Sequence, residues 1–172
     1  MSSQYDAIII GTGIIGGAIG LELARRGSRT LNVDKLPAAG YGSTSNTCAI
    51  IRFHYSTAEG VAMARESYYY WLDWPKHIGA ADEKGMAHYV NTGCVVIKEE
   101  ESNYYQHVMS LLDDLKVVYR ELDPKEFGEI LPFVDTRRFG PPVLAGDPRF
   151  CEPTGDSIAG AIYIPESGYI ND

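Results

Sequence analysis

The chain has 172 residues, of which 45% are hydrophobic and 22% charged, a composition typical of globular proteins and not of disordered ones. Its formal net charge of −8 and its lack of a basic run argue against nucleic acid or an anionic membrane surface as a partner. The apolar run that begins at Ala7 follows an acidic residue and is interrupted by glycines. We therefore expect no signal peptide and no membrane span, and a cytoplasmic protein.

The first three predicted elements form a β-α-β unit. Residues 5–10 form an apolar run that is too short for a helix and is followed at once by glycine, so we predict a strand buried on both faces, as in parallel sheets. From Ile14 to Arg26 apolar residues recur at helical spacing, and Gly27 ends the pattern. Residues 30–33 predict a second strand, which completes the unit.

The rest of the chain alternates between helical and extended patterns. Residues 35–47 are rich in Gly, Ser, Thr and Ala and predict a loop. We predict helices over 57–74, 100–115 and 124–131 and strands over 89–98 and 117–120. Asp123 is the expected N-cap of the last helix, because Pro124 suits its first position. The prolines between 141 and 165 predict turns and short strands.

The cysteines and histidines do not predict a metal site. Cys48, Cys94 and Cys151 lie far apart without a CxxC pair, and the four histidines show no ligand spacing. We therefore expect buried, reduced thiols. The aromatic group at residues 68–74 fits the packing of a helix onto a sheet.

A glycine motif lies between the first strand and the first helix. Gly11-Thr12-Gly13-Ile14-Ile15-Gly16 is a G-x-G-x-x-G pattern in the strand-to-helix context of dinucleotide binding. Gly11 permits the tight turn, Gly13 lets the backbone approach a pyrophosphate, and Gly16 lets the helix pack closely on the strand. The pyrophosphate is expected at the helix N-terminus, beside Ile14 and Ile15, where free N–H groups favour an anion.

An acidic residue, Asp34, ends the second strand about twenty residues after the glycines, with Lys35 beside it. A carboxylate at this place accepts hydrogen bonds from the adenosine ribose hydroxyls and repels a 2′-phosphate, which argues against NADP. These residues do not distinguish FAD from NAD, because both bind such a unit in the same way.

Small residues and hydroxyls fill the loop that follows, and a cation comes after it. We expect this loop to run along the cofactor and to deliver Arg52 to its far end. The loop residues predicted to bind the cofactor are Gly42, Ser43, Thr44, Ser45 and Thr47.

Three stretches together resemble the D-amino acid oxidase and sarcosine oxidase family of flavoproteins. They are Tyr5-Asp6 through Asp34-Lys35 with the Gly-Ser-Thr-Ser loop, Ile50-Ile51-Arg52-x-x-Tyr55, and the terminal Pro165-Glu166-Ser167-Gly168-Tyr169-Ile170-Asn171-Asp172. The glycine motif is shared by many flavoproteins, whereas the second and third stretches are more specific.

The resemblance implies FAD as the cofactor and oxidation of a C–N bond in an amino acid or secondary amine of the sarcosine, glycine or D-amino acid type, by hydride transfer to flavin. It also implies that Arg52 binds the substrate carboxylate, and a guanidinium is well shaped for bidentate carboxylate recognition. Tyr55 is a candidate for the same pocket, with a packed core tyrosine as the equal alternative.

The chain departs from the resembling family at two positions. Ala49 stands where some sarcosine oxidases carry a second arginine beside the flavin, which leaves a dehydrogenase open as well as an oxidase. Asn46 stands where some relatives have a flavin-linking histidine, so we expect no covalent attachment through this loop.

We therefore predict an α/β fold with a Rossmann-like FAD-binding β-α-β unit and flavin loop at residues 1–56. A helical segment of the same domain is expected at 57–88, and the start of an α+β substrate domain with a return segment at 89–172. The chain is expected to be truncated, with its catalytic second half missing or supplied by a complementary chain. The alternatives are an NAD-dependent dehydrogenase and a non-catalytic nucleotide-binding fragment or subunit.

Overall fold

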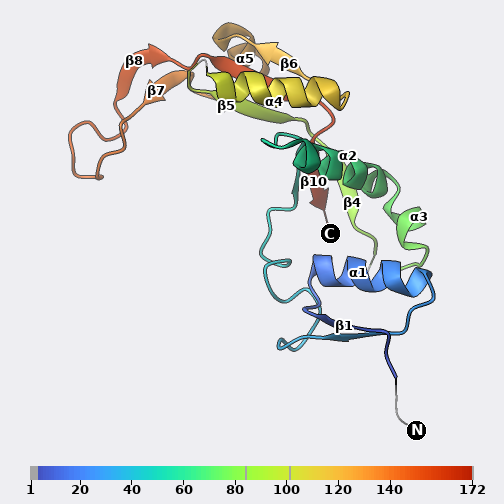
Figure 1. Ribbon diagram of the computed structural model, residues 1–172. Helices are drawn as coiled ribbons and strands as arrows, with labels where there is room; N and C mark the ends of the chain where they lie inside the picture. The colour runs from blue at the N-terminus through green and yellow to red at the C-terminus, as the bar shows by residue number, and fades with distance from the viewer. Residues whose placement is uncertain (1–3, 84, 101, 172) are drawn as a thin grey trace. The chain divides into compact units, whose positions relative to one another are not determined.

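The computed structural model describes residues 4–83, 85–100 and 102–171 (Figure 1). The chain divides into two compact units, which we call the N-terminal unit (Met1–Cys48) and the C-terminal unit (Ala49–Asp172). No helix among the described residues is both long and apolar enough to cross a lipid bilayer.

The N-terminal unit contains the predicted β-α-β arrangement. Strand β1 (Ala7–Ile10) pairs in parallel with β2 (Thr30–Val33), and helix α1 (Ile14–Arg25) connects them. The helix ends where predicted, because Gly27 adopts a left-handed φ of 84° and donates its N–H to the carbonyl of Ala24. The predicted β-α-β unit is confirmed.

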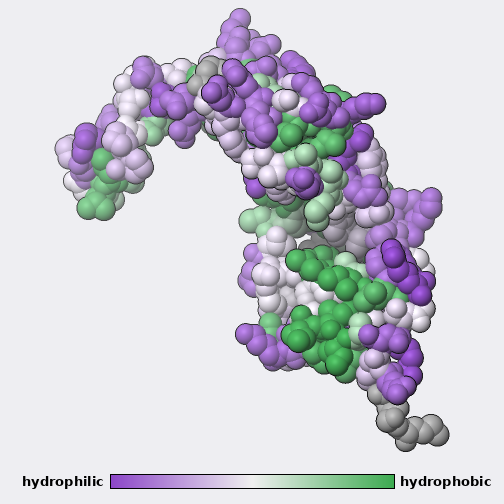
Figure 2. Space-filling model, in the orientation of Figure 1, coloured by the Kyte–Doolittle hydropathy of each residue, from purple (hydrophilic) through white to green (hydrophobic). Residues whose placement is uncertain are grey.

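The prediction that the first strand is buried on both faces is wrong. Ile9 is 8% exposed, but Ile8 and Ile10 on the opposite face of the strand are 62% and 88% exposed. Figure 2 shows this apolar surface of the unit in green. The apolar run indicates that both faces of β1 are hydrophobic, but it does not indicate whether another layer of helices or strands covers the outer face.

The C-terminal unit is built from antiparallel sheets. Its elements are β3 (Ile50–Ile51), α2 (Ala58–Leu72), α3 (Trp74–Ile78), β4 (His88–Asn91), β5 (Cys94–Lys98), α4 (Asn103–Asp114), β6 (Arg120–Leu122), α5 (Pro124–Ile130), β7 (Arg137–Phe139), β8 (Pro153–Ser157), β9 (Gly160–Ile164) and β10 (Gly168–Asn171). The strand orders are β3-β10-β4, β5-β9-β6 and β7-β8. The last two strands in the chain are therefore the central strands of two separate sheets.

Several predicted boundaries in this unit differ from the structure. The predicted strand at 89–98 is two strands, because Gly93 has a φ of 73° and donates its N–H to the carbonyl of Ser167. The predicted helix at 57–74 ends at Leu72, and a new short helix, α3, follows with proline in its first turn. The predicted strand at 117–120 lies instead at 120–122, where it pairs with β9.

Two other helices follow their local signals. The Asp123 carboxylate accepts from the N–H of Glu126 at 2.8 Å, and the Glu126 carboxylate accepts from the N–H of Asp123 at 3.0 Å. The predicted N-cap of α5 is therefore confirmed as a full capping box. Helix α4 begins at Asn103, later than the predicted position 100; residue 101 lies outside the described part of the chain, as does Asp172.

The core of the C-terminal unit lies between its sheets and helices. Its fully buried side chains include Phe53, Val61, Val108, Leu112, Ile162 and Ile164 in one cluster and Leu122, Phe127 and Ala161 in another. Cysteine does not join these clusters: Cys48 and Cys151 are exposed and only Cys94 is half-buried, so the predicted burial of the thiols is wrong. The reason is their location, because Cys48 and Cys151 lie in loops.

Replacing Ile162 with alanine is expected to lower the free energy of unfolding by about 2–5 kcal/mol, since the side chain is fully buried on the central strand β9 and its loss leaves a cavity. Ile97→Ala on the neighbouring β5 is the matched control, because Ile97 is 44% exposed, and its expected cost is about 1 kcal/mol. Urea unfolding followed by circular dichroism measures both. Equal losses would contradict the assigned core.

Helix α1 lies very close to the turn after β1 at Gly16. A Cβ atom at Gly16 would overlap the carbonyl oxygen of Gly11, whereas a Cβ atom at the adjacent Gly17 meets nothing. Gly16→Ala should therefore lower the unfolding midpoint, and Gly17→Ala should raise stability by up to about 1 kcal/mol through helix propensity. Thermal unfolding of the two variants tests this, and a Gly16→Ala protein as stable as Gly17→Ala would refute the close approach.

Candidate cofactor-binding and substrate-binding residues

The glycine turn has the backbone geometry that the motif predicts. Gly11 has a φ of 101°, which other residues rarely adopt, and Gly13 is the extended N-cap residue of α1. A Cβ atom at Gly13 would lie 2.9 Å from the hydroxyl oxygen of Thr44, and one at Gly16 would overlap the Gly11 carbonyl. Gly11 is therefore required by its backbone conformation, and Gly13 and Gly16 by the atoms that lie close to them.

The N-terminus of α1 is open to an anion. The Thr44 hydroxyl accepts from the N–H of Ile14 at 3.0 Å, but the N–H groups of Ile15 and Gly16 have no acceptor among the residues that the structure describes. The first turn contains no acidic residue that would compete for the positive end of the helix. These groups could hold a pyrophosphate, so this part of the structure fits a dinucleotide.

The structure brings Asp34 against the glycine turn. Its Oδ2 accepts from the N–H of Thr12 at 2.7 Å and from the Thr12 hydroxyl at 2.9 Å, and its Oδ1 accepts from the N–H of Leu36. The bond from the Thr12 backbone is the main cause that lowers the pKa of Asp34 below its usual range. Because the pKa is lowered, these bonds are present at neutral pH and are lost as the pH falls through it.

Thr12 is a residue that the sequence analysis did not select. It occupies a variable position of the motif, and only its distance to Asp34 in the fold shows that it ties the turn to the second strand. The spacing of 22 residues between a motif threonine and the predicted ribose-binding acid was a signal that could have found it.

The predicted flavin loop is folded back onto the glycine turn. The N–H of Gly40 donates to the carbonyl of Thr12 at 3.0 Å, and Thr44 contacts the start of α1 as described. Within the loop the Ser45 hydroxyl and the Asn46 amide both donate to the carbonyl of Gly42. The loop is thus ordered by its own polar groups, and Lys35, Ser43 and Thr47 lie along it.

Arg52 lies in the C-terminal unit, one residue after β3. Its neighbour Phe53 is fully buried, and this anchors the backbone while the arginine side chain is exposed. The guanidinium lies 5.3 Å from the centre of the Tyr55 ring, so the structure brings these two predicted residues together. Within the described residues, Arg52 forms no ion pair with a carboxylate, and its charge remains available to a ligand.

Two titratable groups on which the charge of Arg52 acts, His54 and Cys94, are uncharged at neutral pH. Burial and then the charge of Arg52 lower the pKa of His54, and its Nε2 is buried without a hydrogen-bond partner in the described chain. Burial raises the pKa of the Cys94 thiol, although Arg52 opposes this. Neither group neutralises the guanidinium, which therefore keeps a full positive charge toward an incoming anion.

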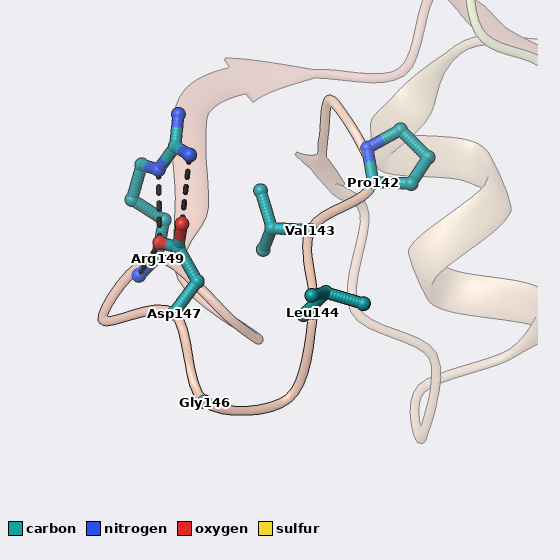
Figure 3. A pocket seen from close by; sticks show the side chains of 6 residues that line it. All are labelled: Pro142, Val143, Leu144, Gly146, Asp147 and Arg149. Atoms are coloured by element: carbon teal, nitrogen blue, oxygen red, sulfur yellow. Dashed lines mark hydrogen bonds and ion pairs between the residues drawn. The ribbon is translucent and has the colours of Figure 1, made fainter.

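A hollow of about 740 Å³ lies in the loop between β7 and β8 (Figure 3). It is lined by Pro142, Val143, Leu144, Gly146, Asp147 and Arg149, none of which is a predicted site residue. Arg149 donates from both Nε and an Nη atom to Asp147, at 3.0 and 2.8 Å, and this pairing lowers the pKa of Asp147. Because the guanidinium is already paired, this hollow offers no free cation to a substrate carboxylate.

Comparison with known proteins identifies the family. The model of the family described as FAD dependent oxidoreductase (DAO) matches residues 6–172. Monomeric sarcosine oxidase from Bacillus sp. (strain B-0618) is 37% identical over 78 residues, which cover 44% of this chain and 20% of that protein.

Solved structures show the same fold. L-proline dehydrogenase from P. horikoshii matches with a TM-score of 0.71 at 20% identity, over 98% of this chain and 38% of that one. Glycine oxidase from Geobacillus kaustophilus matches with a TM-score of 0.65 at 21% identity, over 98% of this chain and 41% of that one. The chain thus spans well under half the length of these proteins. The predicted family, the α/β fold and FAD as the cofactor are confirmed, and the NAD alternative is not supported. The chain belongs to the FAD dependent oxidoreductase (DAO) family.

Proposed function

We propose that this chain carries the FAD-binding unit and the substrate-carboxylate arginine of an enzyme that oxidises the C–N bond of an amino acid or a secondary amine. The observation that carries the proposal is the uncompensated guanidinium of Arg52, held over the Tyr55 ring in a protein of net charge −8. The names of the similar proteins support it, since sarcosine, glycine and L-proline are all amino acids with a free carboxylate.

The N-terminal unit supplies the cofactor contacts in this proposal. The free N–H groups of Ile15 and Gly16 would bind the pyrophosphate, and Asp34 would accept hydrogen bonds from the adenosine ribose. Residues 35–47 would follow the cofactor toward the flavin, with Gly42, Ser43, Ser45 and Thr47 as backbone and hydroxyl contacts. When bound, FAD supplies the two-electron acceptor, taking a hydride equivalent from the substrate carbon.

The C-terminal unit supplies the substrate contact. Arg52 would form a bidentate pair with the carboxylate, which fixes the amino acid by the end that does not react. Tyr55 would stabilise the guanidinium in its position through the contact between cation and ring. Further walls of the flavin site would come from sequence outside these 172 residues, as the coverage of 38% and 41% of the similar structures suggests.

Replacing Asp34 with alanine should weaken FAD binding, because it removes charge-assisted hydrogen bonds worth on the order of 1.5–3 kcal/mol, a factor of roughly 10 to 150 in Kd. Fluorescence titration of the apoprotein with FAD measures the change. Glu22→Ala is the control, since Glu22 is an exposed acid of the same unit that pairs only with Arg25. An affinity unchanged in the Asp34 variant would refute the ribose assignment.

Replacing Arg52 with alanine should raise the KM for amino-acid substrates about tenfold or more and leave the flavin content unchanged, because it removes carboxylate binding without touching the N-terminal unit. The measurement is flavin reduction in the FAD-loaded enzyme with a panel of N-methyl and D-amino acids. Arg137→Ala is the matched control: Arg137 also lies over an aromatic ring, Phe139, but its charge is already paired with Asp135.

Two results would count against this assignment. An unchanged KM in the Arg52 variant would mean that Arg52 is a surface residue that does not bind the substrate. In an enzyme that includes the remaining walls of the flavin site, bound FAD that is not reduced by any amino acid or amine would favour the non-catalytic alternative.

A further inference from the structure

A small hollow with aromatic walls lies at the corner between α2 and α3, beside β4. Its volume is about 160 Å³, and its walls include Trp71, Trp74, Pro75 and Tyr89. All of these residues belong to the C-terminal unit, and none has a part in the proposed FAD or carboxylate sites. The hollow is below the size range of pockets for drug-sized ligands, so it suits a compact head group of a few heavy atoms.

The aromatic walls are held in place by contacts outside the hollow. The Trp71 and Trp74 rings are stacked, with centres 4.1 Å apart and planes inclined by 24°, and the Trp74 ring also packs against the His77 imidazole, with centres 5.5 Å apart. The Tyr89 hydroxyl donates to the carbonyl of Glu166 at 2.6 Å, and the Tyr89 ring packs edge-on against Tyr68. Rings fixed in this way need little reorganisation when a ligand binds, and the faces of such rings carry partial negative charge.

The electrostatic surroundings favour a positive ligand. The hollow lies at the C-terminal end of α2, the negative end of its dipole, and the last turn of this fully described helix contains no basic residue. Glu166 adds a negative charge close to Tyr89; burial and then the charges of Tyr68 and Glu166 raise the pKa of Tyr89 to about 12. The opposing groups are the imidazole of His88, which also lines the hollow, and the basic residues Lys76 and His77 of α3, the helix that contributes Trp74 and Pro75 to the wall.

We propose that this hollow is a binding site for a small methylated or quaternary ammonium ion. Two tryptophans and a tyrosine form the walls, and the carbonyl end of a 15-residue helix supplies the negative potential. Aromatic rings bind such ions because the charge is spread over methyl groups that cannot donate strong hydrogen bonds and cost little to remove from water. The proposal stands independently of the function proposed for Arg52.

The chain offers a direct optical test, because Trp71 and Trp74 are its only two tryptophans. Choline is titrated into the full chain at about pH 8, to keep histidine neutral, and intrinsic fluorescence is followed. Its neutral isostere 3,3-dimethylbutan-1-ol is titrated in parallel, with sodium chloride as the ionic-strength control. We expect a saturable change with choline and an affinity at least about fivefold weaker for the alcohol.

Variants locate the site. Trp71→Leu should weaken choline binding about fivefold or more while Trp74 remains as the reporter. Tyr41→Leu, which removes an exposed ring of the N-terminal unit, should leave the binding unchanged. Saturation-transfer NMR from the indole protons of the unmodified chain to the choline methyl groups gives the same information without a variant, should Trp71→Leu fail to fold.

Four outcomes would overturn the proposal. Equal affinities for choline and the neutral alcohol would mean that the hollow binds by apolar contact and does not recognise the positive charge. A fluorescence change that does not saturate would mean that no site exists. Saturation transfer that is absent from the indole protons, or unchanged binding in a folded Trp71→Leu protein, would place the ligand elsewhere.

Discussion

The carbonyl oxygen of Gly11 occupies the space that a side chain at position 16 would need, and the N-terminal unit depends on this contact. It brings the first turn of α1 directly against the end of β1. The positive φ of Gly11 turns the chain into the helix, and the N–H groups of Ile15 and Gly16 have no acceptor in the described chain. Thr12, on the same turn, donates to Asp34, the residue that follows strand β2. One backbone contact thus aligns the helix dipole, the turn and the acid.

A similar constraint organises the C-terminal unit at Gly168, where a Cβ atom would overlap the carbonyl of Val90. Gly168 pairs with Asn91 on one side and with Ile51 on the other, so it fixes β3 and β4 across the same strand. This pairing determines the position of Arg52, because Arg52 is the next residue after Ile51. The buried side chain of Phe53 anchors the segment on the other side of the arginine. The position of the arginine is therefore determined by residues more than a hundred positions away in the sequence.

The sequence predicted well the features that depend on neighbouring residues. The glycine turn, α1 with its end at Gly27, and the capping box of Asp123 and Glu126 all follow from short local patterns. It failed where distant parts of the chain decide. Nothing near Gly93 shows that Ser167 will accept its N–H and divide the predicted strand. The exposure of Ile8 and Ile10 depends on whether a second layer covers them, which no periodicity reports. For the candidate site, the sequence predicted Asp34, Arg52 and Tyr55, whereas the contact of Thr12 with Asp34 and that of Arg52 with Tyr55 are visible only in the fold.

The arginines of the C-terminal unit show why pairing matters more than charge. Arg137 and Arg149 lie on exposed segments like Arg52, but each forms a bidentate pair with an aspartate two residues earlier. Such a pair leaves little attraction for a further anion, since the field of the cation is cancelled at short range. Arg52 has no acid within its own turn; it has the Tyr55 ring, which orients the guanidinium without neutralising it. The chain has an excess of acidic residues, yet among the residues that the structure describes Arg52 forms an ion pair with none of them, as the proposed binding of a substrate carboxylate would require.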